Sequence, residues 1–200
     1  MGKDKGRTDE APEEDAVTSL RARGSTREAG FTLVDMMFVL ALIGMLSTLA
    51  LPALLRAKSA AHSASALGTV RIISGAQLSY ALTCGLGFFA PDLPTLGVPP
   101  SGFTDTFLPA ELTTGAAVLH NGYTISLYAT PLAGTPPTCN GLAAGATAPT
   151  YVIVADPIDP VANPRFFGLN SDGVVYEDSA TFAGTMPETG APPSGAPLDR

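Results

Sequence analysis

The sequence has no tryptophan, only two cysteines and only two histidines among its 200 residues. Aromatic residues make up 7% of the chain, so any hydrophobic core has to be built largely from aliphatic side chains. The histidines, His62 and His120, lie far apart, and neither belongs to a metal-ligand or catalytic-triad spacing. Phosphate-binding glycine loops, dinucleotide fingerprints, zinc-protease motifs and nucleophile elbows are also missing from the sequence. These absences predict that the protein is not an enzyme.

Basic residues are scarce in most of the chain. After Gly30 there are five Lys or Arg against eleven Asp or Glu. Proteins that bind nucleic acid do so mainly through clustered basic side chains, so we expect no nucleic-acid partner. The low charge and the 21 glycines and 18 prolines are typical of an exported domain with long loops.

The two cysteines are Cys84 and Cys139, and neither has a CxxC spacing or a nearby histidine that would suggest a metal site. If the protein is exported, the simplest expectation is one disulfide between them. By closing a long loop it would contribute about 3–4 kcal/mol to stability in the chain-entropy description. The alternative is a pair of unrelated buried thiols.

The longest apolar run extends from Phe31 to Leu55, which as a helix would span about 37 Å, enough to cross a bilayer. It contains one charged residue, Asp35. A carboxylate at membrane depth costs about 2.5–3.5 kcal/mol by insertion scales, so it is rarely kept there without a partner. The sequence therefore predicts a membrane helix that docks against another group.

The segment GFTLVDMMFVLALIGMLSTLALPALL resembles the N-terminal signature of type IV pilins and type II secretion pseudopilins. That signature has glycine, phenylalanine, threonine, leucine, a further apolar residue and glutamate, followed by an apolar helix with a proline near its end. Gly30, Phe31 and Pro52 match it, whereas Asp35 stands where the family usually has glutamate. The resemblance is specific over residues 30–55 and weaker beyond them.

The resemblance implies that a prepilin peptidase removes a leader, residues 1–30, by cutting between Gly30 and Phe31. The same enzyme would N-methylate Phe31. It further implies that Asp35 pairs with the N-terminal amine of a neighbouring subunit during assembly, and that Pro52 kinks the helix. The alternative for Asp35 is an acid that interacts only with the dipole of its own helix.

The same resemblance implies self-assembly into a helical filament with other pilins or pseudopilins, on an inner-membrane assembly platform. The protein would be a single-pass bacterial inner-membrane protein with its head in the periplasm, and later part of a periplasmic pseudopilus or an extracellular pilus. Flanking charge favours this orientation only modestly, because basic residues flank both ends of the span: Arg21, Arg23 and Arg27 before it, Arg56 and Lys58 after it.

The leader is long and mixed in charge for the family, and it reads as disordered. One explanation is a misassigned start, because Val17 or Leu20 could be encoded by an alternative start codon. The other is simply a long leader.

The run of helix-forming residues continues beyond the apolar span, and residues 56–82 are rich in alanine and amphipathic. A mostly apolar face recurs at spacings of three and four, which predicts packing against a sheet; it comprises Ala66, Val70, Ile73, Gln77 and Tyr80. We interpret His62 as a solvated surface residue.

Residues 83–179 are expected to form a globular head. Four segments predict strands: Gly122–Tyr128, which approximates alternation, the β-rich run Tyr151–Ala155, and Arg165–Leu169 and Val174–Tyr176. The last two flank Asn170–Gly173 and predict a hairpin. Residues 180–200 are rich in Pro, Gly and Thr and are expected to be a flexible, weakly docked tail.

Cofactors are not expected, although Asp172, Glu177 and Asp178 leave a weak possibility of a calcium site. The predicted fold is α+β and pilin-like, with a long N-terminal helix packed on a three- or four-stranded antiparallel sheet. The predicted function is a structural subunit of a type IV pilus or a type II secretion pseudopilus. The alternatives are a minor pilin that initiates fibres or takes up DNA, and a membrane-anchored periplasmic enzyme or binding protein.

Overall fold

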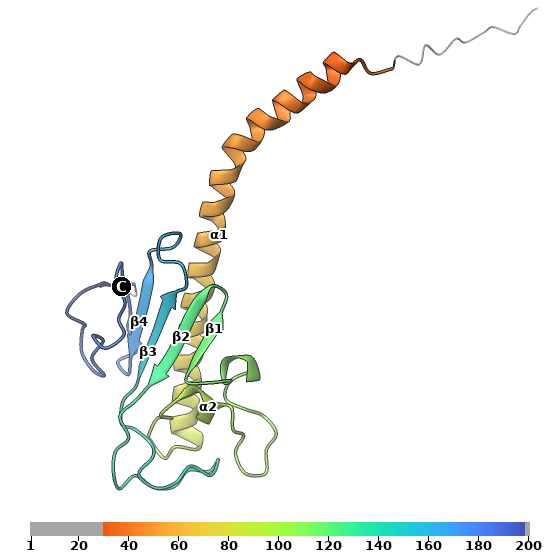
Figure 1. Ribbon diagram of the computed structural model, residues 1–200. Helices are drawn as coiled ribbons and strands as arrows, with labels where there is room; N and C mark the ends of the chain where they lie inside the picture. The colour runs from red at the N-terminus through yellow and green to blue at the C-terminus, as the bar shows by residue number, and fades with distance from the viewer. Residues whose placement is uncertain (1–29, 199–200) are drawn as a thin grey trace, which may run out of the picture. The chain divides into compact units, whose positions relative to one another are not determined.

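The computed structural model describes residues 30–198 (Figure 1). The leader before Gly30 and the alternative starts at Val17 and Leu20 lie outside the described residues. The chain divides into two units, of which the first ends at Ser47 and the second begins at Thr48.

The first element is helix α1, Leu33–Thr83, which is 51 residues long. Its residues are mostly Leu, Ala, Met and Ile, and the structure is helical on both sides of Pro52. The helix ends where the backbone turns left-handed at Leu86 and Gly87, with φ values of 53° and 93°. There the N–H of Gly87 donates to the carbonyl of Ala81 and closes the helix end.

The second half of α1 carries the buried face that its spacing predicts. Ala66, Val70, Ile73, Gln77 and Tyr80 are all 0% exposed, so this prediction is confirmed. Gln77 is the one polar member of the stripe, and its amide makes two hydrogen bonds of 2.9 Å to the backbone of Ala90. This pairing satisfies the buried amide and fixes the segment that follows the helix.

A six-stranded antiparallel sheet lies alongside this half of α1, and each strand pairs with the next strand in the chain (Figure 1). The α+β class with a long N-terminal helix and an antiparallel sheet is confirmed, whereas the predicted number of three or four strands is wrong. The strands are β1 Ala117–His120, β2 Tyr123–Tyr128, β3 Val152–Pro157, β4 Phe166–Asn170, β5 Val175–Asp178 and β6 Ala196–Pro197.

The strands missed from the sequence are the two at the edges. β1 is short and joins β2 through Asn121 and Gly122, both with positive φ, 47° and 82°. Asn-Gly is the strongest short-range hairpin signal, and here it marks the start of β2 as well as the presence of β1. β6 has only two residues and includes Pro197, which is tolerated because an edge strand needs few donors.

The sheet is covered on both faces. Tyr123, Ile125 and Ile153 belong to the main core, which they share with the buried stripe of α1. On the opposite face Val152 and Val154 pack with residues from the C-terminal segment in a second, smaller cluster. β3 is therefore apolar on both sides, which explains why its sequence is a continuous apolar run rather than an alternating one.

The C-terminal segment is docked, in contrast to the weakly docked tail expected over residues 180–200. Phe182 is 1% exposed and Met186 is 6% exposed. Gly168 makes room for the ring, because a Cβ at that position would lie 2.7 Å from Cγ of Phe182. The low apolar content of the segment concealed this contact, since one ring in a glycine-lined pocket is enough to hold it.

Two loops complete the head. The first contains the short helix α2, Leu93–Leu96, and the 3-10 helix η1, Ala110–Leu112. The second connects β2 to β3 and contains Cys139. The structure has the expected disulfide between Cys84 and Cys139, which are 55 positions apart in sequence, so the end of α1 is joined covalently to the β2–β3 loop.

Replacing Phe182 by Ala should lower the free energy of unfolding by about 3–5 kcal/mol, because it removes a buried ring that packs against Gly168 and Gly195, which have no side chains to fill the space. Thermal unfolding of the full chain in detergent, followed by circular dichroism, measures this. Phe103→Ala is the matched control, since Phe103 is 70% exposed. Equal stability of the two variants would show that the C-terminal segment is not docked.

Candidate functional site

The start of α1 carries a reciprocal capping arrangement between Thr32 and Asp35. The backbone N–H and the hydroxyl of Thr32 donate to Oδ2 of Asp35 over 3.0 Å and 2.7 Å. In return the N–H of Asp35 donates to Oγ1 of Thr32 over 3.2 Å. This is the capping-box pattern, which satisfies backbone donors that a helix start leaves without partners.

Only one oxygen of the Asp35 carboxylate takes part in the cap. Within residues 30–198 no hydrogen bond reaches Oδ1. Asp35 therefore has a local structural role and still has one oxygen able to accept a bond from another group. The sequence left open pairing with a neighbouring amine or interaction with the dipole of its own helix alone, and the geometry is compatible with both.

The bond between Gly30 and Phe31 precedes the helix. Neither residue is in a regular element, and both are exposed. A peptide bond has to be accessible to enter a protease active site, and this bond joins two exposed residues outside any regular element. Phe31 is followed by the first helical residue, Leu33, after a single intervening position.

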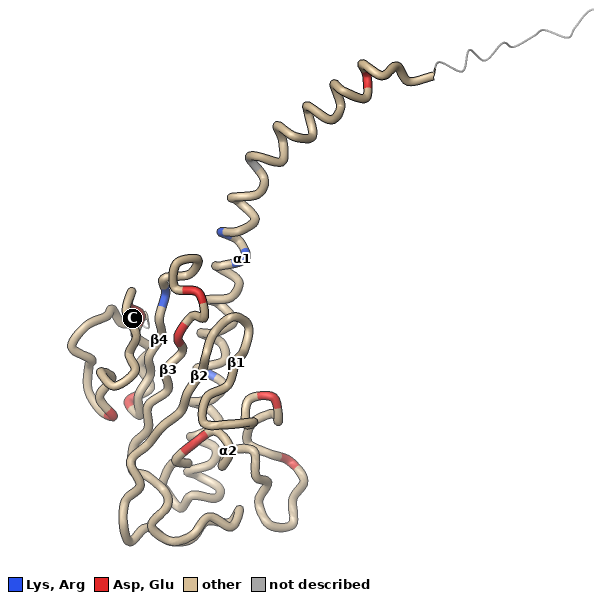
Figure 2. The backbone as a smooth tube through the Cα atoms, viewed as in Figure 1, with Lys and Arg blue, Asp and Glu red and all other residues tan. Residues whose placement is uncertain are grey.

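The first half of α1 is apolar on all sides and, among the described residues, uncovered. From Phe31 to Leu46 the exposure of the large apolar side chains lies between 43% for Val39 and 77% for Phe31. Figure 2 shows this stretch free of charge except at Asp35. By length and composition, α1 has a stretch able to cross a membrane.

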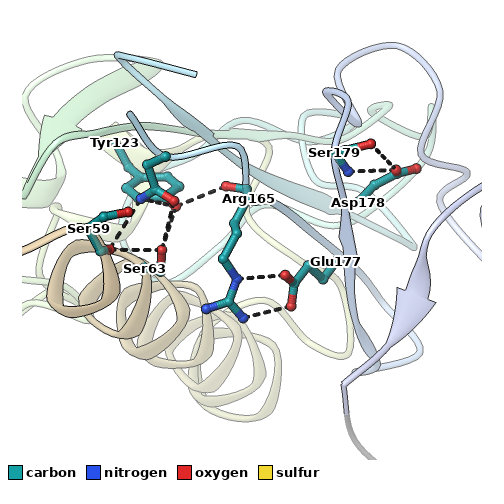
Figure 3. A network of polar contacts seen from close by, with 8 residues as sticks. Ser59, Ser63, Tyr123, Arg165, Glu177, Asp178 and Ser179 are labelled. Carbon is teal, nitrogen blue, oxygen red and sulfur yellow. Dashed lines mark hydrogen bonds and ion pairs between the residues drawn. The ribbon is translucent and has the colours of Figure 1, made fainter. Parts of the chain in front are cut away.

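A buried polar network ties the β3–β4 loop to α1 (Figure 3). Ser63 of α1 lies 3.1 Å from the Tyr123 hydroxyl and donates to Oδ1 of Asn163 over 3.0 Å. The amide of Asn163 donates to the Tyr123 hydroxyl over 2.8 Å, and that hydroxyl donates to the carbonyl of Arg165 over 2.9 Å. Burial raises the pKa of Tyr123, so its hydroxyl keeps the proton that it donates.

Arg165 and Glu177 form a two-pronged ion pair beside this network (Figure 3), with nitrogen–oxygen distances of 2.6 Å and 2.8 Å. The hydrogen bonds from the guanidinium lower the pKa of Glu177. The side chain of Arg165 is 44% exposed, so the ion pair adds little to the stability of the protein. Its main effect is to fix the start of β4 beside β5.

His62 is a half-buried surface residue, and it makes a backbone contact that the sequence did not suggest. Its Nδ1 lies 2.6 Å from the carbonyl oxygen of Asn121, so Nδ1 carries the proton and donates it. The ring also closes over Gly122, where a Cβ would lie 3.1 Å from Nδ1. His62 therefore holds the β1–β2 turn against the helix.

The three acids considered for calcium do not converge. Asp172 accepts from the N–H of Gly190, Glu177 binds Arg165, and Asp178 accepts from the N–H of Ser179. In the described part of the chain no group of three or more His, Cys, Asp or Glu side chains is arranged to hold a metal ion.

The sequence singles out Gly30, Phe31 and Asp35 as candidate site residues, and the network around Tyr123 was missed. One signal was available, because Ser63 lies three residues before Ala66 on the buried stripe of α1. A serine on an apolar face requires a polar partner, and Tyr123 points inward from β2.

Comparisons of the chain with models of known protein families, with curated proteins and with solved structures found no match.

Replacing Tyr123 by Phe should lower the free energy of unfolding by about 1–3 kcal/mol, because it leaves the buried amide of Asn163 and the Arg165 carbonyl short of partners. Urea titration of the full chain in detergent measures this. The control is Tyr176→Phe, because the hydroxyl of Tyr176 makes no hydrogen bond within residues 30–198. A loss no larger than that of the control would contradict a structural role for the network.

Proposed function

We propose that this chain is a structural subunit of a type IV pilus or a type II secretion pseudopilus. In this proposal prepilin peptidase removes residues 1–30 and methylates Phe31. The mature protein is held in the bacterial inner membrane by the first half of α1, with its head in the periplasm. Subunits then assemble on the inner-membrane platform by packing their α1 helices together.

One observation carries the proposal. A single helix has a first half that is apolar and exposed on all sides and a second half with a stripe buried under an antiparallel sheet. The first half follows an exposed Gly30–Phe31 bond and has one acid, Asp35, in its first turn. Before assembly such a helix lies in the membrane, and in the core of a filament it packs against the apolar helices of its neighbours.

Asp35 supports the proposal through its chemistry. The amine released at Phe31 would be cationic, and a cation and a carboxylate that enter an apolar filament core together neutralise each other. Oδ2 would keep the capping bonds from Thr32, and Oδ1 would accept from the amine of a neighbour. Aspartate is one methylene shorter than the family's glutamate, and in this proposal docking tolerates the shorter reach.

The signature does not distinguish a pilus from a pseudopilus, or a major from a minor subunit. Asp35 favours a subunit that inserts along the fibre over one that only initiates it, because insertion is the step in which the acid finds a partner. A membrane-anchored periplasmic enzyme or binding protein is the alternative from another class. The head's low basic content speaks against direct binding of DNA.

The processing step is tested by the mass of the mature N-terminus. Protein from cells that contain a prepilin peptidase should begin at Phe31 and carry one added methyl group. Gly30→Leu should leave the leader attached, because the cleavage site requires a small residue. A working protein that retains residues 1–30 would contradict the proposal.

The assembly step is tested at Asp35 with three substitutions. Asp35→Ala removes both the cap and the charge, Asp35→Asn keeps an acceptor for Thr32 but removes the charge, and Asp35→Glu keeps the charge. Without the charge a buried amine is left unpaired, at a cost of about 3–5 kcal/mol for each subunit. We expect the Ala and Asn variants to be inserted and cleaved but to form few filaments.

Filament yield in sheared or periplasmic fractions, scored by electron microscopy, is the measurement, with Asp35→Glu as the matched control. Normal filaments from the Asn variant together with few from the Ala variant would limit Asp35 to its capping role. Normal filaments from both would refute its role in assembly.

A further inference from the structure

The β3–β4 loop carries apolar side chains on its outside. Ile158 is 55% exposed, and Val161 at the tip is 93% exposed. Single exposed apolar residues are ordinary on protein surfaces. Here, however, the two residues lie on a loop that packs beside α1. Asn163 of the same loop contacts Ser59 and Ser63, which lie one to two helical turns after Leu55.

The loop is well fixed by its own hydrogen bonds. Oδ1 of Asp159 accepts from the N–H groups of Val161 and Ala162, at 3.0 Å and 3.1 Å. The N–H of Ile158 donates to the carbonyl of Gly122 over 3.0 Å, which joins this loop to the β1–β2 turn. These bonds fix the loop in a conformation in which residues 158–162 are all exposed.

A cleft of about 600 Å³ lies between this loop and α1. Of the five basic residues after Gly30, three line it, namely Arg56, Lys58 and Arg165. Figure 2 shows the basic positions of α1 at the level of this loop. Arg165 is neutralised by Glu177, and Asp159 also lines the cleft, so the net positive charge comes from Arg56 and Lys58.

Arg56 and Lys58 make no ion pair with a carboxylate of residues 30–198. They follow directly after Leu54 and Leu55, which are each 66% exposed and end the apolar run. Basic side chains next to exposed apolar ones are the combination that binds the headgroup layer of an anionic membrane. The body of the chain is acidic, so this cleft is the exception to its charge.

We propose that the β3–β4 loop and the cleft beside it form a membrane-contact surface, defined by Arg56, Lys58, Ile158 and Val161. Ile158 and Val161 enter the headgroup layer, and Arg56 and Lys58 bind the phosphates of anionic phospholipids. The proposal rests on the proposed function, because it requires the first half of α1 to lie in the bilayer. It goes further by giving the head a defined resting orientation on the membrane before assembly.

The absence of tryptophan allows a direct test, because one introduced tryptophan reports its own surroundings. The full chain carrying Val161→Trp is reconstituted into vesicles that contain phosphatidylglycerol with brominated acyl chains. We expect its emission to shift to shorter wavelength and to be quenched by the bromine. Adding Arg56→Gln and Lys58→Gln should abolish both effects, since each basic residue contributes about a fivefold gain in binding to an anionic surface.

Two control positions frame the result. Phe103→Trp is the negative control, because its loop lies at the disulfide end of α1, where the nearby Ser101 contacts Cys139. That end is about 30 Å along the helix from Ser63, which contacts the β3–β4 loop. Leu42→Trp lies in the apolar run and reports insertion of the helix itself. We expect strong quenching at position 42, intermediate quenching at 161 and none at 103.

The outcomes separate the two proposals. Quenching at position 42 with none at 161 overturns the membrane-contact surface and leaves membrane anchoring intact. No quenching at 42 overturns the anchoring on which both depend. A shift in the emission of the tryptophan at position 161 that appears only at high protein-to-lipid ratio assigns the surface to a second copy of the chain. Equal quenching in vesicles of neutral phosphatidylcholine removes the role of Arg56 and Lys58. Either result overturns the proposal.

Discussion

The structure depends on one constraint, which is that helix α1 requires two different surroundings along its length. Before Leu46 its large apolar side chains are exposed on every side within the described residues, whereas from Ala66 onward one stripe is fully buried. A helix that is apolar all round is unfavourable in water and needs lipid or other helices. The head meets only the second requirement, so the protein reaches a stable state only when something else covers the first half.

The head is built around the buried stripe. Aliphatic residues from α1, β2 and β3 fill the main core, and polar groups occur in it only where they have partners, as with Gln77 and Ser63. These polar contacts and the Cys84–Cys139 disulfide attach loops to the helix at both of its ends in the head. A small aliphatic core is thus supplemented by specific contacts that fix the loops around it.

The helical and core features could be predicted from the sequence because they are periodic. The stripe from Ala66 to Tyr80 and the alternation in β2 need only local spacing to be recognised. The docking of Phe182 and the partners of Ser63 in the Tyr123–Asn163 network could not be predicted, because these contacts join residues that are distant in sequence; the position of Ser63 on the stripe indicates only that a polar partner is needed. For Asp35, the expectation of a partner came from the cost of a carboxylate in an apolar run, while its capping bond with Thr32 required coordinates.

The sheet is a simple meander in which each strand pairs only with its neighbours in the chain. The strands can therefore be added in chain order, without waiting for a later segment to complete an earlier pair. Low sequence separation between contacts favours rapid folding. The exception is the Cys84–Cys139 bond, which joins residues 55 positions apart and cannot close until the β2–β3 loop has folded back onto the end of α1.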